Sequence, residues 1–377
     1  MQLHMKKTST VLRHKNNGFI IAKSRFFLII ALIITAIATT SCDYSSLAVT
    51  NVSASDDIKI DNTKPNDSTA ISAEPETPKT FYNYLTGLTT SEINSGRRPV
   101  SFCTQNYDGC VPYGLKLADI IIEAPSAEGK TSVCVMTTDY ENAKRIGAVS
   151  ALPSCLSEIS SAFGAIKVYS GLIGNTNVDD NCSLDALSCN SSVFFRDNNI
   201  GSSDNLMADG SHIAESVSNL GYTPDISSSY VSPYIVDNNV VYERSSAAKY
   251  ITVPYWSTLK VNFSYDSNSD KYIRMQNSKI YRDGDNSELT YKTVFILFCD
   301  TTTVSTHSGS TISLDMSDGG DGYVIFGGKA VEMSWKRDEN GNLIFSAKDG
   351  SSLKIPSGNI YIGLLQISNK KDLIIGN

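Results

Sequence analysis

Histidine is scarce in this chain, and closely spaced cysteine pairs are absent. Four histidines occur among 377 residues, and only His212 and His307 follow residue 41. None of the eight cysteines forms a C-x-x-C pair. A structural zinc site takes four nitrogen or sulfur ligands, typically from such pairs. We therefore expect no metal site, and no motif in the sequence indicates a cofactor.

Two other patterns are also missing. The chain has no G-x-S-x-G motif, which argues against an α/β-hydrolase with its exposed nucleophilic serine. It also lacks an apolar run of the roughly 20 residues that a membrane-spanning helix needs. The run Phe26–Ala38 has 13 residues, which is the length of a signal-peptide core.

Positive charge is scarce once the first 41 residues are set aside. Those residues hold six Lys or Arg and no acid, whereas the rest has 26 basic and 39 acidic residues, a net charge of −13. An acidic body is repelled by nucleic acid and by anionic lipid headgroups. We therefore expect no nucleic-acid partner.

The first 41 residues are typical of an export signal. A basic segment precedes the run Phe26–Ala38, and small residues precede Cys42. This resembles a lipobox, in which the cysteine receives a lipid and the chain is cut just before it, although Thr39 replaces the usual Leu-like residue. We predict a signal peptide over 1–41 and lipid attachment at Cys42. The protein would then lie outside the cytoplasm, anchored to the cell membrane; a plain signal anchor is the alternative.

Seven cysteines remain after Cys42, and an extracytoplasmic location permits disulfides. Two pairs have the same spacing and lie in predicted loops, which makes local bridges one prediction: Cys103 with Cys110, and Cys182 with Cys189. The spacing does not fix the pairing, and because seven is odd, at least one thiol stays free or pairs between chains.

The pattern along the chain predicts an α+β fold. Residues 42–80 are rich in Ser, Asp, Asn, Thr and Pro and predict a disordered tether. Residues 81–225 predict a layered, mixed α/β N-terminal domain. Its expected elements are a hairpin over 119–124 and 131–137, and helices over 156–163 and 211–220.

Residues 226–377 predict a mostly antiparallel, β-rich C-terminal domain, because the helical period disappears and strands alternate with turns. Gly327-Gly328 is a two-residue hairpin signal. The expected strands form a meander over Leu259–Tyr265, Lys271–Met275, Thr293–Phe298, Tyr323–Phe326, Lys329–Trp335, Leu353–Ile355 and Ile360–Leu365.

A series of short segments follows a characteristic order. The N-terminal half carries Leu85-Thr86-Gly87-Leu88, Arg97-Arg98-Pro99-Val100, Ala118-Asp119-Ile120, Ile146-Gly147 and Phe195-Arg196-Asp197. The C-terminal half carries Tyr265-Asp266, Tyr272-Ile273-Arg274, Gly328-Lys329, Trp335-Lys336 and Pro356-Ser357-Gly358. Together they resemble the YerB-like family of bacterial lipoproteins. The resemblance implies a two-part α+β fold and a membrane anchor, and it supplies no reaction.

This chain departs from the family pattern at basic positions. Relatives tend to carry an Arg-rich stretch after the Ile-Gly pair, where residues 148–153 here contain no Arg. Relatives have His-Asn where this chain has Asp204-Asn205. If those basic positions bind an anion in relatives, this protein has lost that function or changed its ligand.

Charged residues on apolar elements mark a candidate site. Asp119 and Glu123 fall on one face of a predicted strand, and acids in such a place should be paired or lie at an opening. Arg145 and Arg196 are their candidate partners, and structural ion pairs are the alternative to a ligand site. The candidate ligand cleft comprises Asp119, Glu123, Arg145, Arg196, Asp197, Asn205 and Arg274.

No intact catalytic constellation is recognisable, so we assign no catalytic residue. We expect a non-enzymatic binding or interaction module whose partner is an envelope protein, a peptide or a wall fragment. The alternative is a hydrolase that acts on cell-wall or surface polymers with paired carboxylates, drawn from Asp119, Glu123 and Asp197. Carboxylates facing across an open cleft would favour the hydrolase. Acids paired with arginine and buried between layers would favour the binding module.

Overall fold

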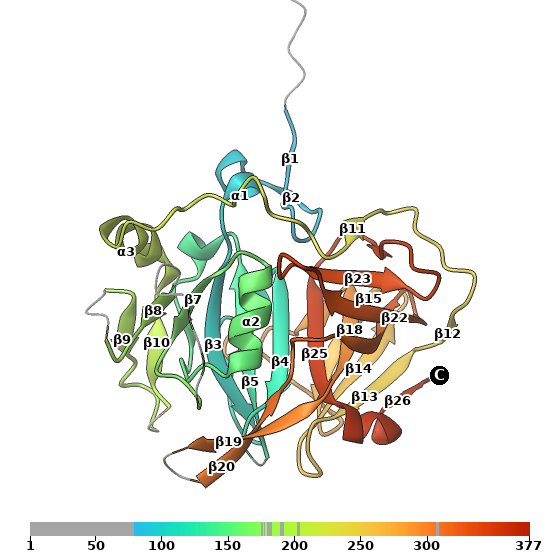
Figure 1. Ribbon diagram of the computed structural model, residues 1–377. Helices are drawn as coiled ribbons and strands as arrows, with labels where there is room; N and C mark the ends of the chain where they lie inside the picture. Colours follow the sequence, from blue (N-terminus) through green and yellow to red (C-terminus); the bar gives the residue numbers. More distant parts are fainter. Residues whose placement is uncertain are drawn as a thin grey trace, which may run out of the picture. The chain divides into compact units, whose positions relative to one another are not determined.

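Figure 1 shows the computed structural model of the chain. It describes residues 79–377, apart from positions 128, 175, 177, 179–182, 189–191, 202–203 and 307–308. The predicted signal peptide, the lipid-attachment cysteine and nearly all of the predicted tether lie outside the described residues. No helix of the described part has the length and apolar character needed to cross a membrane.

One large sheet runs through the described part of the chain (Figure 1). In spatial order its strands are β12 (Ser246–Ala247), β22 (Lys329–Arg337), β21 (Gly320–Phe326), β18 (Thr293–Cys299), β25 (Ile360–Gln366), β4 (Ile120–Pro125), β5 (Lys130–Thr137), β3 (Val100–Tyr107), β7 (Ile166–Tyr169) and β8 (Ser183–Asp185). Strand β23 (Leu343–Ala347) also pairs with β22. The sheet therefore takes strands from both halves of the sequence.

The two halves meet where β25 pairs with β4. Strand β25 runs parallel to β18 on one side and parallel to β4 on the other. The predicted antiparallel meander is therefore wrong at this position. The residues of β25 are buried almost throughout, and near-continuous apolar runs of this kind are typical of parallel strands covered on both faces. The two predicted domains thus lie within one compact unit.

A second sheet covers one face of the large one. It contains β16 (Lys279–Ile280), β15 (Lys271–Gln276), β14 (Lys260–Asp266), β13 (Tyr250–Pro254) and β26 (Ile374–Gly376), with β17 (Thr290–Tyr291) also paired to β15. Strands β14 and β15 confirm two expected strands of the meander, and in the turn between them Asp266 accepts hydrogen bonds from the backbone amides of Asn268 and Ser269. The remaining strands form small sheets: β1 (Phe81–Tyr82), β2 (Thr89–Thr90), β6 (Ile146–Gly147), β9 (Phe194–Arg196), β10 (Leu206–Ala208), β11 (Ile235–Val236), β24 (Lys354–Ile355), β19 (Thr301–Thr306) and β20 (Gly309–Leu314).

Helices are short and few among the described residues, so the fold is largely β. They are α1 (Glu92–Gly96), α2 (Ser154–Ala162) and α3 (Ile213–Asn219), with the 3-10 segments η1 (Leu115–Leu117), η2 (Tyr140–Asn142), η4 (Gly210–His212) and η5 (Ile367–Asp372). Both predicted helices are present, as α2 and as η4 with α3. Gly164 and Gly221, which follow them, have positive φ angles of 69° and 71°, as expected for helix-ending glycines.

Alternating residues of the large sheet feed two separate cores. In β4, Ile121 packs with residues of the second sheet, whereas Ile120 and Ile122 pack in a cluster on the other face that includes α2. Helix α2 contacts β4, β5 and β7 on that face (Figure 1). Burial on both faces places Glu123, the one charged side chain of β4, between the two sheets.

Candidate functional site

Asp119 lies just before β4, and its carboxylate is bound by Thr138, which directly follows β5. Its Oδ2 accepts hydrogen bonds from the amide and the hydroxyl of Thr138, at 2.7 and 3.1 Å. Burial raises the pKa of this carboxyl, although the hydrogen bonds to it act in the opposite direction. Neither predicted arginine partner contacts it in these hydrogen bonds, so its role here is to hold the end of β5.

Glu123 is completely buried between the two sheets. Its Oε1 accepts hydrogen bonds from Asn106 and Thr131, at 2.8 and 2.5 Å. Its Oε2 accepts from Arg274 at 3.0 Å and from Tyr361 at 2.9 Å. All four sites on the carboxylate are thus taken by protein donors, and nothing is left to act on a substrate.

Arg274, on β15 of the second sheet, brings the positive charge that balances Glu123. Its side chain is 1% exposed, and its guanidinium lies over the ring of Tyr281 with 4.0 Å to the ring centre. Burial raises the pKa values of Tyr255 and Tyr361 well above the ordinary range, and the negative charge of Glu123 adds to this effect. Both phenols therefore stay neutral hydrogen-bond donors, and the cluster is a structural tie between the sheets.

The remaining members of the predicted cleft gather elsewhere, on the small β6–β10–β9 sheet. Arg145 forms a salt bridge of 2.5 Å with Asp197 and lies 3.9 Å from the ring centre of Tyr113. Arg196 donates to the side chain of Asn205 at 2.7 Å. The seven residues thus fall into three groups, and the arginine that pairs with Glu123 is Arg274 rather than Arg145 or Arg196.

The predicted bridge between Cys103 and Cys110 is wrong in this structure, where both are free thiols. Cys103 lies in the middle of β3 and is fully buried, whereas Cys110 lies beyond the end of that strand with its Sγ 3.6 Å from the carbonyl of Gln105. An extended strand moves its residues apart by about 3.3 Å each, so close spacing in the sequence does not bring the two thiols together. Cys182 and Cys189 lie outside the described residues.

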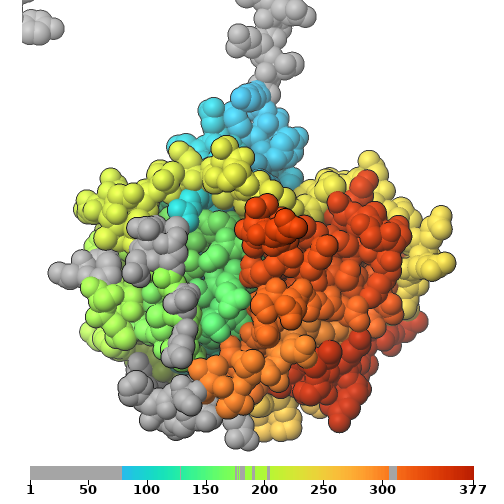
Figure 2. All heavy atoms as spheres, viewed as in Figure 1, coloured from blue at the N-terminus to red at the C-terminus, as the bar shows by residue number. Residues whose placement is uncertain are grey.

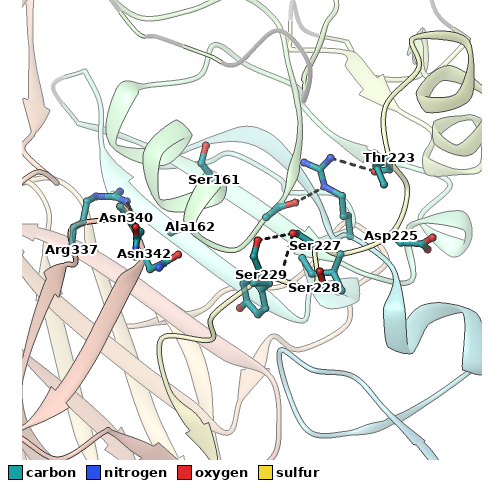
Figure 3. Close-up of a pocket in the computed structure, with 15 residues that line it drawn as sticks. Ser161, Ala162, Thr223, Asp225, Ser227, Ser228, Ser229, Arg337, Asn340 and Asn342 are labelled. Carbon is teal, nitrogen blue, oxygen red and sulfur yellow. Dashed lines mark hydrogen bonds between the residues drawn. The ribbon is translucent and has the colours of Figure 1, made fainter.

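A polar cleft of about 730 Å³ offers a different candidate site (Figure 3). Its walls come from Arg98, from the end of α2, from the segment 223–230 that follows α3, and from the turn between β22 and β23. The close-up places Arg337, Asn340 and Asn342 on one side and Thr223 and Asp225 on the other. In the space-filling view, the yellow-green chain after α3 runs along the upper side from the green half to the orange and red half (Figure 2).

Arg98 fixes one wall of this cleft. Its Nε donates to the carbonyl of Gly164 at 2.8 Å, and its Nη1 donates to the carbonyl of Thr223 at 3.3 Å. The guanidinium thereby joins the end of α2 to the segment after α3. Within that segment, Ser227 and Ser229 bond to each other through their hydroxyls at 2.7 Å.

Arg337 fixes the opposite wall. Its Nε donates to the carbonyl of Met316 and its Nη1 to that of Gly341, both at 2.8 Å. Its Nη2 lies 4.0 Å from a carboxylate oxygen of Glu158. Because the arginine is held by backbone carbonyls on a strand end, the polar groups of the adjacent turn have a rigid support.

The lining offers hydrogen bonds rather than a concentrated charge. Hydroxyl and amide side chains predominate among its polar groups: Ser161, Thr223, Ser227, Ser228, Ser229, Asn340 and Asn342. Asp225 is the one carboxylate among the described residues that line it. A glycosidase requires two carboxyl groups across the substrate, so this lining is suited to binding and does not supply that pair.

The prediction of the site missed this cleft. Its residues come from four places that are remote in sequence, and most of them lie in turns or at the ends of elements. Two signals were available: the run Ser227-Ser228-Ser229, directly after the expected boundary at residue 225, and the Asn340-Gly341 turn. Turn residues of this kind are ordinarily taken as solvated loops, and only the fold shows that they face each other.

Two family models match the chain. One, described as "Protein of unknown function (DUF3048) N-terminal domain", covers residues 85–223, and its C-terminal counterpart covers residues 251–362. The chain belongs to this YerB-like family. This chain thus contains both segments, and the serine run of the cleft falls between the two matched regions. The resemblance stated from the sequence is confirmed.

Two findings from Bacillus subtilis extend the family comparison. A protein named "Putative lipoprotein YerB" from strain 168 is 24% identical over 307 residues, which is 78% of this chain and 88% of that protein. The crystal structure of YerB matches this fold with a TM-score of 0.65 at 21% identity, over 78% of this chain and 98% of that chain. The YerB-like fold therefore spans essentially the whole described part.

Proposed function

We propose that this YerB-like protein is a lipid-anchored extracytoplasmic lipoprotein that binds a hydroxyl-rich and amide-rich wall fragment in the cleft between α2, residues 223–230 and the β22–β23 turn. The observation that carries the proposal is the composition of that lining, in which hydroxyl and amide groups predominate. Such groups are matched by sugar hydroxyls and N-acetyl amides, which both donate and accept hydrogen bonds.

The partners of the three carboxylates considered for hydrolysis support a binding role rather than catalysis. Glu123 is saturated by four protein donors, Asp119 holds the end of β5, and Asp197 is paired with Arg145. A general acid or base must reach the proton that it transfers. A buried acid between two sheets cannot do so without opening the core.

The anchor is supported by the sequence and by the name of a relative. The basic segment, the apolar run and Cys42 follow one another as in a lipoprotein signal, and the matched Bacillus subtilis protein is named as a lipoprotein. A labelled fatty acid supplied to producing cells should appear on the chain, and Cys42→Ser should remove the label and release the protein from membranes. A label that persists in Cys42→Ser would reject this attachment site.

Binding is tested with a variant that fills the cleft. Ser228 is exposed in the lining, and Ser218 is exposed at the end of α3, away from it. With muropeptides from digested wall as the probe, Ser228→Trp should weaken retention by the full chain at least about tenfold, because the indole occupies the ligand volume. Ser218→Trp, the matched control, should bind as the wild type does.

The result decides between the proposed ligand and other partners. Equal retention of muropeptides by both tryptophan variants would reject the cleft as the binding site. If the wild-type chain converts the muropeptides to smaller products, the non-enzymatic role is rejected. If Asp119→Asn and Glu123→Gln still convert them, those two carboxylates are excluded as the catalytic groups.

A further inference from the structure

Four buried cysteines gather on the α2 side of the large sheet: Cys103, Cys134, Cys155 and Cys299. Two of them are direct partners across neighbouring strands. In the antiparallel pairing of β3 with β5, Cys103 lies opposite Cys134. Both side chains are completely buried in the same core cluster, so both point to the same face of the sheet.

The hydrogen bonds around this pair determine how close the two residues come. The carbonyl of Cys103 accepts from the amide of Ser150, on the side of β3 away from β5. The carbonyl of Met136 accepts from the amide of Asp119, on the β4 side of β5. Since backbone groups alternate in direction along a strand, Cys134, two residues before Met136, also points its backbone toward β4. The pair is therefore a non-hydrogen-bonded one.

That class of pair has the geometry that a disulfide needs. Directly opposite residues at non-hydrogen-bonded positions have their Cα atoms about 4.5 Å apart, closer than at hydrogen-bonded positions. Disulfides join residues whose Cα atoms are about 4.4–6.8 Å apart, with Cβ atoms about 3.5–4.5 Å apart. No backbone movement is required to connect the two residues.

We propose that Cys103 and Cys134 are the site of a cross-strand disulfide, formed by exchange with a disulfide oxidant while the chain folds. The proposal requires an oxidant but not the membrane anchor, so its failure and that of the proposed function are separable. The nearness of the two thiols lowers the pKa of Cys134 and raises that of Cys103.

The exchange is balanced by the oxidant. The Cys134 thiolate attacks one sulfur of the oxidant's disulfide and expels the other sulfur as a thiol. Cys103 then loses its proton and attacks the mixed disulfide at Cys134, which releases the second thiol. The two cysteines lose two protons and two electrons, and the oxidant gains them. Because both residues are fully buried afterwards, the reaction precedes the packing of α2 over β3 and β5.

Peptide mapping without reduction tests the pairing. The full chain in detergent is unfolded, reduced and refolded with oxidised glutathione as the oxidant, after which free thiols are alkylated and the chain is digested. A second sample, taken from whole producing cells, is alkylated directly in denaturant. Most of the folded chain should yield one linked peptide pair that contains Cys103 and Cys134 and is lighter by two hydrogens than the separate peptides.

Matched variants identify the partners. Cys110→Ser should leave the linked pair in place, because that thiol lies outside the core. Cys103→Ala and Cys134→Ala should each remove it and leave the other cysteine alkylated, a readout that does not require these variants to be stable. Full alkylation of Cys103 and Cys134 in natively folded wild-type chain, or linkage of either one to Cys110, Cys155 or Cys299, would overturn the proposal.

Discussion

Glu123 is a charge with no access to water, and its contribution to stability depends on its partners. Removing one member of a buried ion pair leaves the other uncompensated, which costs about 3–5 kcal/mol. We therefore expect Glu123→Gln, and separately Arg274→Met, to lower the free energy of unfolding by about that amount. The double variant should lose less than the sum of the two, because it leaves no unpaired charge. Urea unfolding followed by tryptophan fluorescence measures all three.

An exposed ion pair provides the comparison. Arg282 and Glu288 are joined at 2.7 Å, with side chains that are 38% and 41% exposed. Pairs of this kind contribute about 0–1 kcal/mol, so Glu288→Gln should change stability by no more than that. A loss in Glu123→Gln as small as the loss in Glu288→Gln would show that the cluster between the sheets does not hold them together.

Asp119 links stability to pH with a definite sign. Because burial raises its pKa in the folded state, the folded protein binds the proton more tightly than the unfolded chain does. The stability that protonated Asp119 contributes is complete below the ordinary aspartate pKa of about 4. It is lost as the pH rises through the raised pKa of Asp119 in the folded protein. Asp119→Asn should therefore gain stability relative to the wild type between pH 4 and pH 7, as measured by urea midpoints.

Asp349 is the control for that measurement. Its pKa is lowered by hydrogen bonds from Ser351, so its contribution is present at neutral pH and is lost as the pH falls. Asp349→Asn should therefore lose stability relative to the wild type as the pH rises, which is the opposite trend. The same trend in both variants would contradict the assigned environment of Asp119.

At the level of elements, contiguous residues were sufficient to predict individual turns, hairpins and helices. They were not sufficient to predict which distant strands pair. The Gly327-Gly328 turn, the hairpin of β4 and β5, and helix α2 were all predicted from contiguous residues. The position of β25 was not, because its burial pattern does not specify which strands flank it. For the same reason the prediction named Glu123 and Arg274 as site residues but not as partners, since 151 positions separate them. The cleft residues, drawn from four separate parts of the sequence, carried no joint signal.

The turn between β21 and β22 offers a matched pair of substitutions. Gly327 and Gly328 have φ angles of 57° and 72°, but an added Cβ is free at Gly327, whereas at Gly328 it would lie 3.1 Å from the Tyr265 ring. Gly327→Ala should cost about 1–2 kcal/mol for the left-handed conformation, and Gly328→Ala should cost more. Thermal unfolding of the two variants checks the order, and a smaller loss for Gly328→Ala would contradict the contact with Tyr265.

For the whole molecule, the shared sheet makes the two halves interdependent. Residues 81–225 alone would leave the edge of β4 unpaired, and residues 226–377 alone would expose the edge of β25. Exposed, apolar strand edges of this kind aggregate. We expect each half to be unfolded or insoluble when produced alone, as judged by circular dichroism and size-exclusion chromatography. Folding of either half as a soluble monomer would show that the family's two segments are autonomous domains.

The position of β25 also determines the order of assembly. This strand joins the two halves of the large sheet, yet its residue Ile360 lies 240 positions after its partner Ile120 on β4. A chain made from its N-terminus therefore carries β4, and later β18, before the strand that joins them has been made. Because pairing between segments so far apart is slow, the large sheet stays incomplete until β25 has been made. A chain that is still unfolded is also the form in which a narrow membrane pore can accept a protein.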